Sequence, residues 1–257
     1  MPQVAPVSLR SVTLGAGRPA VCVPFVGATL DALRRELTAL PAGAADLVEL
    51  RIDFFDGVDD RAAVSDALAL VRGTLAADIP LLFTFRTRSE GGQRDLDATA
   101  YADLLQHAIA SGRIDAIDVE QFTPRPQLER IVSVAHAAGI PVVISSHDFA
   151  ATPPREEIVA RLRAQQELGA DVVKIAVMPH SARDVLTLLQ ATEEFGRLWA
   201  TRPAITMSMG PLGVVSRLAG EIFGSCVTFG AVGAASAPGQ VAAGRLRAVL
   251  DVVHDAQ

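Results

Sequence analysis

Short runs of β-branched and other apolar residues alternate along the chain with longer amphipathic or Ala- and Leu-rich stretches. This alternation is typical of units in which one strand is followed by one helix. The apolar runs predict strands over Val21–Val26, Leu47–Phe54, Pro80–Arg86, Ala116–Glu120, Pro141–His147, Asp171–Val177, Pro203–Met209 and Val227–Val232. The stretches between them predict helices over Leu30–Leu40, Arg61–Leu75, Ala98–Ala110, Arg125–Ala138, Arg155–Leu168, Ala182–Leu198 and Gly239–Val253.

Eight such units in a chain of 257 residues predict an α/β protein with a single (β/α)8 TIM barrel domain over residues 1–257. A doubly wound open sheet is the structural alternative, but it usually carries a Gly-rich fingerprint after its first strand. Here the first strand runs into Phe25-Val26-Gly27-Ala28, which is no such fingerprint. Residues 1–20 lie outside the repeat, and the loose alternation in Ser8–Leu14 predicts a small strand or hairpin across the bottom of the barrel.

The two-residue period of a strand divides its side chains between two faces. In Asp171–Val177, Lys174 shares a face with Val172 and Ala176, whereas the three branched residues of the other face suit packing against helices. Lys174 is therefore expected to point into the barrel. The same argument directs inward a set of polar and sulfur-containing side chains from five other strands, namely Glu49, Arg51, Asp53, Thr84, Arg86, Asp118, Glu120, Ser145, His147, Met207 and Met209.

These inward charges need an explanation, because branched aliphatic residues normally fill the interior of such a barrel. Both signs of charge are present, so a lattice of ions that pair with one another is one explanation. Lys174 and His147 favour an active site instead. Both lie at or near the C-terminal ends of their strands, where barrel enzymes carry out their chemistry.

Composition singles out Lys174 a second time, because it is the only lysine among 23 lysines and arginines. A buried lysine can lose its proton, which an arginine does not, and the free amine forms Schiff bases with ketones. Desolvation and neighbouring arginines are expected to disfavour its charged form. His147 ends the neighbouring strand, about 5 Å away, where it can act as a general acid and base. The residues alone leave two reactions open: carbon–carbon cleavage by an aldolase, and loss of water from a β-hydroxy ketone by a dehydratase.

Charge and cysteine content narrow the range of partners. A net charge of −6 without a basic tract argues against nucleic-acid binding. No apolar stretch approaches the roughly 18 residues of a membrane span. Cys22 and Cys226 lie in apolar runs and predict buried thiols in a reducing compartment, which we expect to be the cytoplasm. No second histidine or cysteine lies at metal-ligand spacing, so neither a metal nor another cofactor is expected.

Several motifs follow one another along the predicted strands. They are Glu49-Leu-Arg-Ile-Asp53, Phe83-Thr-Phe-Arg86, Ser146-His-Asp-Phe149, Val173-Lys-Ile-Ala176, Ser208–Arg217, Thr228-Phe-Gly230 and Ser236–Gln240. From about residue 20 to the C-terminus, this ordered set resembles the type I 3-dehydroquinate dehydratases. The resemblance implies a TIM barrel enzyme that binds 3-dehydroquinate, a small carboxylated polyol ketone, and converts it to 3-dehydroshikimate in the shikimate pathway of aromatic amino acid biosynthesis. It also implies a homodimer.

The resemblance further implies a syn elimination through a lysine Schiff base. Lys174 would form the Schiff base with the C3 ketone, and His147 would remove the C2 proton and then protonate the departing C1 hydroxyl. Glu90 would orient and tune His147. The implied substrate-binding residues are Glu49, Arg51, Arg86, Arg217, Ser236 and Gln240, with Arg217 as the clamp for the substrate carboxylate. Two further implied features are an apolar wall of Met207, Met209 and Phe229, and a lid formed by Gly91–Arg94 and the loop around Ser236.

Two other functions remain open at this point. A Schiff-base class I aldolase acting on a sugar phosphate would use the glycines after the seventh and eighth strands to hold the phosphate. A non-catalytic quinate-pathway sensor would keep the fold and bind the metabolite, but it is expected to have lost the lysine or the histidine. One position departs from the family pattern: Pro24 stands where some members carry a serine that touches the substrate.

Overall fold

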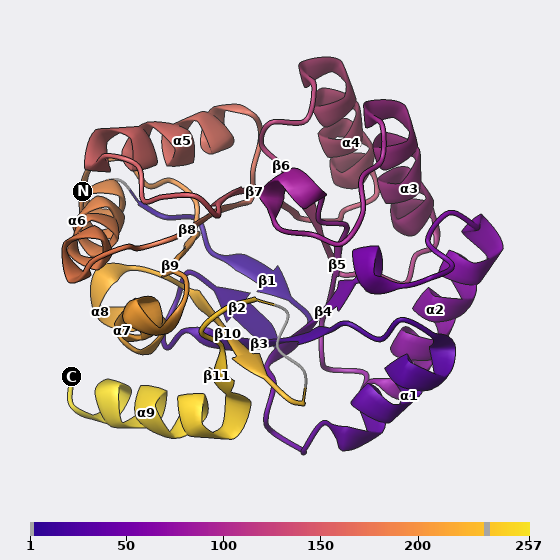
Figure 1. Ribbon diagram of the computed structural model, residues 1–257, viewed down its shortest axis with the longest axis horizontal. Helices are drawn as coiled ribbons and strands as arrows, with labels where there is room; N and C mark the ends of the chain where they lie inside the picture. The colour runs from indigo at the N-terminus through magenta and orange to yellow at the C-terminus, as the bar shows by residue number, and fades with distance from the viewer. Residues whose placement is uncertain (1–2, 234–236) are drawn as a thin grey trace.

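The computed structural model describes residues 3–233 and 237–257, and within them eight parallel strands form the wall of a barrel. These strands are β3 (Ala20–Phe25), β4 (Leu47–Arg51), β5 (Leu81–Thr84), β6 (Ala116–Glu120), β7 (Val142–Asp148), β8 (Val172–Val177), β9 (Ala204–Ser208) and β10 (Val227–Ala231). From β3 to β9 each strand pairs with the next in chain order, and β10 pairs with β3. Figure 1 shows the ring of strands with the helices outside it. The predicted TIM barrel class is confirmed.

The ring closes between β9 and β10 through few main-chain bonds. Cys226 N donates to Ala204 O over 2.8 Å, and Ala204 forms an isolated bridge with Ser225. The Ser225 hydroxyl adds two hydrogen bonds to the main chain of β9: it accepts from Thr206 N at 2.9 Å and donates to Thr206 O at 3.2 Å. The connection between the two strands contains the short helices α7 (Val214–Leu218) and α8 (Gly220–Phe223), which are too short for the hydrophobic pattern to have predicted.

In the described part of the chain, seven longer helices cover the outside of the strands (Figure 1). They are α1 (Leu30–Ala39), α2 (Arg61–Thr74), α3 (Ala98–Ala110), α4 (Arg125–Ala137), α5 (Arg155–Glu167), α6 (Ala182–Leu198) and α9 (Ala243–Asp255). Six of them agree with the predicted bounds to within one residue. The prediction for the last helix was wrong at its start, because β11 (Val241–Ala242) pairs with Gly230 and Ala231 and keeps the chain extended there.

The second predicted strand was also too long. It ends at Arg51, and Ile52–Phe54 form a 3₁₀ turn, η1, in which Phe55 N donates to Ile52 O at 3.0 Å. This turn leaves Asp53 fully buried next to Arg51, where the two side chains pair.

The two faces of each strand belong to two separate hydrophobic cores. In β8, Val173, Ile175 and Val177 belong to the core between the sheet and the helices. Val172 and Ala176, on the other face, belong to the core inside the barrel. Lys174 lies between these two residues on the inner face, as the two-residue period predicted.

An antiparallel hairpin of β1 (Val7–Leu9) and β2 (Val12–Leu14) packs against the N-terminal ends of the barrel strands. Leu9 and Leu14 join the inner core. At the hairpin turn, Arg10 donates to Asp115 Oδ1 and to Ala77 O, each over 2.6 Å, and both acceptors precede barrel strands. The predicted hairpin is thus confirmed, and it leaves the C-terminal ends of the strands for the site described next.

Candidate active site

The C-terminal half of the barrel interior contains a pocket of about 470 Å³, including the part that is open to solvent, and both charged and apolar side chains line it. Its lining comprises Glu49, Arg51, Arg86, Glu90, Gly91, His147, Phe149, Lys174, Ala176, Met207, Met209, Arg217, Phe229, Ala237 and Gln240. Eight of the nine predicted site residues therefore share one cavity, whereas Ser236 lies outside the described residues. The predicted apolar wall of two methionines and a phenylalanine belongs to the same pocket.

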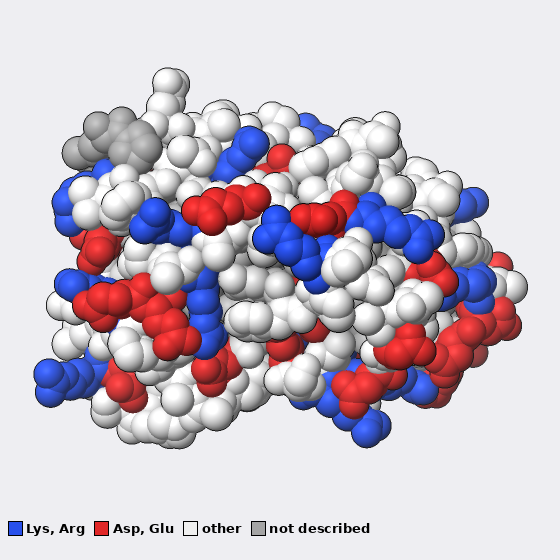
Figure 2. Space-filling view, turned by 90° about the horizontal axis from the view of Figure 1, so that it is seen from above, with Lys and Arg blue, Asp and Glu red and all other residues white. Residues whose placement is uncertain are grey.

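On the outer face of the molecule drawn in Figure 2, acidic and basic side chains are interspersed.

Lys174 is held inside this pocket by carboxylates. Its side chain is almost completely buried, and its Nζ lies 2.9 Å from Asp118 Oδ2 and 3.7 Å from Glu49 Oε1. The same nitrogen lies over the ring of Phe229, 4.9 Å from its centroid. The sequence led us to expect arginines around the amine. The structure shows instead that carboxylates form ion pairs with it, because the strand register puts Lys174 opposite Ser145 of β7 and within reach of Asp118 on β6.

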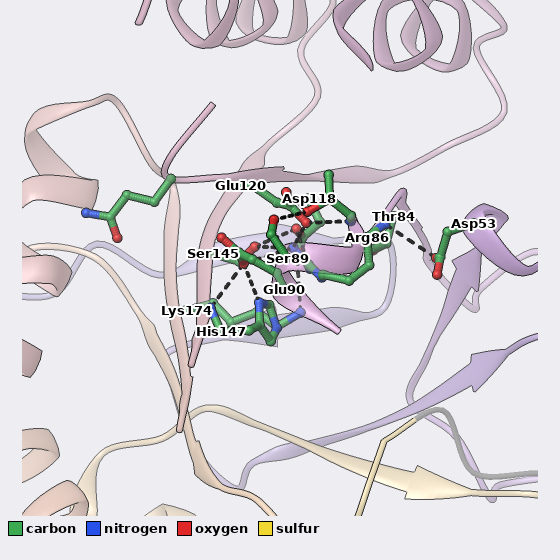
Figure 3. A network of polar contacts seen from close by, with 12 residues as sticks. Asp53, Thr84, Arg86, Ser89, Glu90, Asp118, Glu120, Ser145, His147 and Lys174 are labelled. Carbon is green, nitrogen blue, oxygen red and sulfur yellow. Dashed lines mark hydrogen bonds and ion pairs between the residues drawn. The ribbon is translucent and has the colours of Figure 1, made fainter. Parts of the chain in front are cut away.

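His147 lies on β7, adjacent to Lys174 on β8, and Figure 3 shows the two side chains next to each other. Its Nδ1 lies 2.8 Å from Glu90 Oε2, and its main-chain N donates to the same oxygen over 3.0 Å. Burial lowers the pKa of His147 well below its usual value, and the cations of Arg86 and Lys174 lower it further. The imidazole is therefore uncharged at neutral pH, and Nε2 makes no hydrogen bond with another described residue.

Glu90 is placed by a tight turn after β5. It ends the 3₁₀ turn η2 (Arg88–Glu90), and Gly91 follows with a φ of 85°. A Cβ on Gly91 would come within 2.2 Å of the Phe149 ring, so this position requires glycine for space as well as for conformation. Burial raises the pKa of Glu90 to about 8; Arg86 opposes this shift, and Glu120 and Asp118 add to it. The carboxyl group and the imidazole thus both favour their uncharged forms.

Arg86 is the centre of the ion-pair lattice seen in Figure 3. It donates to Asp118 Oδ1 at 2.7 Å, to Glu120 Oε1 at 3.0 Å and to Ser145 Oγ at 3.0 Å. Burial opposes ionisation of Asp118, but Arg86 and Lys174 outweigh it and hold the pKa of this carboxyl group well below its usual range. Arg86 therefore organises the carboxylates around Lys174 and also reaches the pocket.

The other predicted substrate-binding residues of β4 also have partners within the barrel. Arg51 forms a bidentate pair with Asp53, with both N–O distances at 2.8 Å. Glu49 accepts from Thr84 Oγ1 at 2.8 Å. Both explanations considered for the inward charges therefore apply: most of the ions pair with one another, and the same ions line a cavity.

Arg217 on α7 differs from the other cations because no carboxylate pairs with it among the described residues. Its side chain is 2% exposed. Its Nη2 donates to Pro238 O at 3.2 Å, Nη1 lies 3.7 Å from the sulfur of Met207, and Nε has no partner in the described chain. Burial lowers the pKa of Arg217 to about 10. A buried cation without a counter-ion, in the wall of a pocket, favours the binding of an anion.

Sequence reasoning missed one polar residue next to the site. Gln165 of α5 is buried and forms two hydrogen bonds with the main chain of Lys174. A polar residue on the sheet-facing side of a helix is the signal that could have identified it. Within the described residues, no group of three or more potential metal ligands occurs, and no helix there could span a membrane.

A family model for type I 3-dehydroquinase matches residues 21–257. The 3-dehydroquinate dehydratase of Bacillus licheniformis is 49% identical over 248 residues, which cover 96% of this chain and 97% of that protein. The chain belongs to the type I 3-dehydroquinase family. Another relative, the 3-dehydroquinate dehydratase of Syntrophotalea carbinolica, is 50% identical over 98% of this chain and 99% of its own length.

Solved 3-dehydroquinate dehydratases share the fold along nearly the whole chain. The type I 3-dehydroquinate dehydratase of Clostridium difficile, solved with covalently modified comenic acid, has a TM-score of 0.95 and 44% identity, with 99% of both chains covered. The 3-dehydroquinate dehydratase of Geobacillus kaustophilus has a TM-score of 0.93 and 38% identity, covering 98% of this chain and 97% of that one. The resemblance drawn from the ordered motifs is therefore confirmed.

Proposed function

We propose that the chain dehydrates 3-dehydroquinate to 3-dehydroshikimate through an imine between Lys174 and the substrate ketone. The observation that carries the proposal is an inward amine beside an uncharged imidazole on adjacent strands, with Glu90 bound to Nδ1 of the imidazole. Membership of the type I 3-dehydroquinases supports the same reaction. The presence of both Lys174 and His147 argues against the non-catalytic sensor.

Imine formation requires that the ammonium of Lys174 first gives up a proton. Asp118 is a poor acceptor, because its pKa lies well below the usual range. His147 is uncharged and has Nε2 available, so we assign the proton to this nitrogen. The free amine attacks the C3 carbonyl carbon to give a carbinolamine. His147 returns its proton to the carbinolamine hydroxyl, which leaves as water, so that the iminium forms and the imidazole is uncharged again. His147 acts again when water returns to hydrolyse the product imine.

Elimination follows from the iminium, which makes the neighbouring C2–H more acidic. His147 Nε2 removes the C2 proton, and the electron pair moves into the C2–C3 bond to form a neutral enamine. The enamine then expels the C1 hydroxyl, which leaves as water after it takes the proton from His147. Since one base serves both steps from one side of the ring, the elimination is syn. Glu90 orients the ring through Nδ1 throughout.

Substrate binding is assigned to the polar groups that surround this pair. Arg217 takes the substrate carboxylate, for which its fork of N–H groups is suited. The ring hydroxyls are assigned to Glu49, Arg51 and Arg86, which line the pocket together with Gln240. We propose that Gln240 and Ser236 also contact the substrate. The aldolase alternative is less well supported. A sugar phosphate brings about two charges, whereas Arg217 is the one described pocket cation without a carboxylate partner.

The proposal is tested by incubating the protein with 3-dehydroquinate and following the absorbance of the conjugated enone product. Borohydride reduction followed by peptide mapping then locates the adduct, and the sole lysine makes this assignment unambiguous. Lys174→Ala should abolish trapping. His147→Ala should still form the adduct slowly but should not turn over, whereas His136→Ala, on the outer surface, is the matched control. The absence of both enone and lysine adduct in the wild-type protein would refute the proposal.

We further propose that the protein is a homodimer. Support comes from exposed apolar residues on neighbouring elements: Leu186 on α6, Leu212 in the 3₁₀ turn η3 (Pro211–Gly213), Val215 on α7 and Ile222 on α8. Ile222→Glu should shift the sedimentation coefficient toward that of a monomer, while the outward Val252→Glu on α9 should not. Sedimentation of the wild-type protein as a monomer at micromolar concentration would contradict this.

We also propose a cytoplasmic location, supported by the free thiols of Cys22 and Cys226 in the barrel wall. Burial raises the pKa of both thiols, which keeps them protonated. Cell fractionation with an antibody against the protein tests the location.

A further inference from the structure

Gln165 forms two hydrogen bonds with the residue that carries the proposed chemistry, although it lies outside the barrel. It belongs to α5 and has an exposed fraction of 0%. Its Oε1 accepts from Lys174 N over 2.8 Å, and its Nε2 donates to Lys174 O over 2.9 Å. One side-chain amide therefore bonds both polar main-chain groups of the only lysine.

These bonds come from a helix to a residue in the middle of the sheet. Lys174 stands in register with Ser145 of β7 and with Ile205 of β9. The Gln165 amide reaches the main chain of this strand residue from α5. The second hydrogen of Gln165 Nε2 is donated to Gln121 Oε1 at 2.9 Å, and Gln121 N donates to Ser145 O at 2.7 Å. The orientation of the Gln165 amide is thereby fixed, because both of its N–H groups meet acceptors and its oxygen meets a donor.

The opposite end of the lysine is fixed from inside the barrel. Its Nζ lies 2.9 Å from Asp118 Oδ2, and Asp118 Oδ1 accepts from Ser145 Oγ at 2.6 Å. Lys174 is thus held at its main chain by Gln165 and at its amine by Asp118. Between these points lies a flexible four-carbon stem. A shift of the main chain would therefore move the amine relative to both the carboxylate and His147.

We infer that Gln165 is a positioning residue, which sets the place of Lys174 along the barrel axis so that its amine meets the substrate ketone. The inference rests on the proposed function, because it concerns the lysine of the proposed imine. Correct placement of reacting atoms matters strongly, since a displacement of about 1 Å can cost about 100-fold in rate. Gln165 acts through Lys174 and does not line the pocket itself.

The first test uses Gln165→Met, which keeps the length of the side chain and removes all three hydrogen bonds. We expect kcat to fall about 10- to 100-fold while KM changes by less than about threefold. The rate of borohydride-trapped adduct formation should fall in parallel. The matched control is Gln166→Met, because Gln166 also bonds main-chain groups, namely Thr201 N at 2.8 Å and Trp199 O at 3.2 Å. This variant should lose stability yet keep kcat within about twofold.

The second test does not depend on activity. Labelling the protein with ¹⁵N-lysine gives one backbone amide signal, because the chain has one lysine. Gln165→Met should shift this signal and should speed its hydrogen exchange by about tenfold or more, since the amide loses its acceptor. Gln166→Met should leave the signal in place. If Gln165→Met does not fold, Gln165→Leu takes its place; it also removes all three hydrogen bonds and buries no charge, so we expect a fall in kcat of similar size.

The outcomes separate this inference from the proposed function. Wild-type turnover together with an unchanged kcat in Gln165→Met would overturn the positioning role and leave the dehydratase intact. A fall in kcat of equal size in Gln166→Met would also overturn it, because the effect would then follow stability alone. A wild-type protein that gives neither enone nor adduct would overturn the proposed function, and this inference with it.

Discussion

Replacement of Arg217 by methionine should make the free protein more stable while it removes most of the activity. Arg217 is buried, pairs with no carboxylate in the described chain and leaves Nε without a partner. Methionine has a similar length and no charge. The substitution therefore removes a desolvated cation from the unliganded protein, and it removes the proposed partner of the substrate carboxylate from the complex.

The size of both effects follows from the structure. Burial lowers the pKa of Arg217 from its usual value to about 10. The charged form is thus destabilised in the folded protein by roughly 3 kcal/mol. Because the folded pKa is the lower one, this cost is present at every pH below about 10 and is relieved only as the pH rises toward the unfolded value. We expect Arg217→Met to raise the free energy of unfolding by about 1 to 3 kcal/mol, since the lost bond to Pro238 offsets part of the gain. Loss of a bidentate contact with a carboxylate should lower kcat/KM by about 100-fold.

Urea denaturation at pH 7 measures the first effect, and steady-state kinetics with 3-dehydroquinate measures the second. The control is Arg51→Met, because Arg51 forms a bidentate pair with the fully buried Asp53. This control should lose about 3 to 5 kcal/mol, since it leaves a buried carboxylate unpaired. If Arg217→Met is less stable than the wild-type protein by more than about 1 kcal/mol, Arg217 is not the unpaired cation described here. If kcat/KM changes by less than about threefold, its role in carboxylate binding is wrong.

Three further predictions concern the groups around the amine and the imidazole. Burial raises the pKa of Glu90 from 4.5 to about 8, so the free energy of unfolding should fall as the pH rises from the unfolded pKa toward 8. Urea denaturation of Glu90→Gln should show a smaller fall over this pH range. An equal fall in the wild-type protein and the variant would contradict the shift. Gly91→Ala should lower kcat by about tenfold, because its Cβ would lie 2.2 Å from the Phe149 ring and displace Glu90. An unchanged kcat would show that the turn adapts. Asp118→Asn should cost about 3 to 5 kcal/mol in urea denaturation, because Lys174 and Arg86 lose their shared counter-ion; a loss below about 1 kcal/mol would show that other carboxylates replace it.

The faces of the strands could be predicted from the sequence, because the two-residue period depends only on local geometry. Lys174 and His147 lie on the predicted face and on neighbouring strands. The partners of Lys174 could not be predicted in this way. The two-residue period gives the face of the strand on which a side chain lies, but not its position along the barrel axis. That position depends on the register between β6, β7 and β8, which brings Asp118 within reach of the amine.

Arg217 and Gln165 show two other limits of the pattern. Arg217 lies on a helix of five residues, which is too short to produce a hydrophobic period, so only the resemblance to the family marked it. Gln165 lies on a helix that the pattern did predict. Its inward amide is a single polar residue on an apolar face, and nothing local indicates that it meets the main chain of Lys174. Contacts between elements far apart in sequence are the part that required the structure.

The carboxylates around Lys174 favour one particular step of the proposed reaction. The ammonium of the free protein and the iminium of the adduct both carry one positive charge on the same nitrogen, so Asp118, Glu49 and the Phe229 ring stabilise both. Removal of the C2 proton gives a neutral enamine and leaves these carboxylates without their cation. Loss of the C1 hydroxyl restores the iminium, and the buried carboxylates therefore drive the enamine toward product.

Arginines around the lysine, as the sequence led us to expect, would have the opposite effect. They would favour the free amine and ease imine formation, but elimination would then have to regenerate a cation beside other cations. The observed arrangement favours loss of the C1 hydroxyl from the enamine, because this step restores the cation beside the carboxylates. Asp118 cannot readily accept the lysine proton, because its low pKa reflects the same ion pairs. In the proposed reaction the proton goes to His147, and burial with two nearby cations lowers the pKa of the imidazole so that it starts the cycle uncharged.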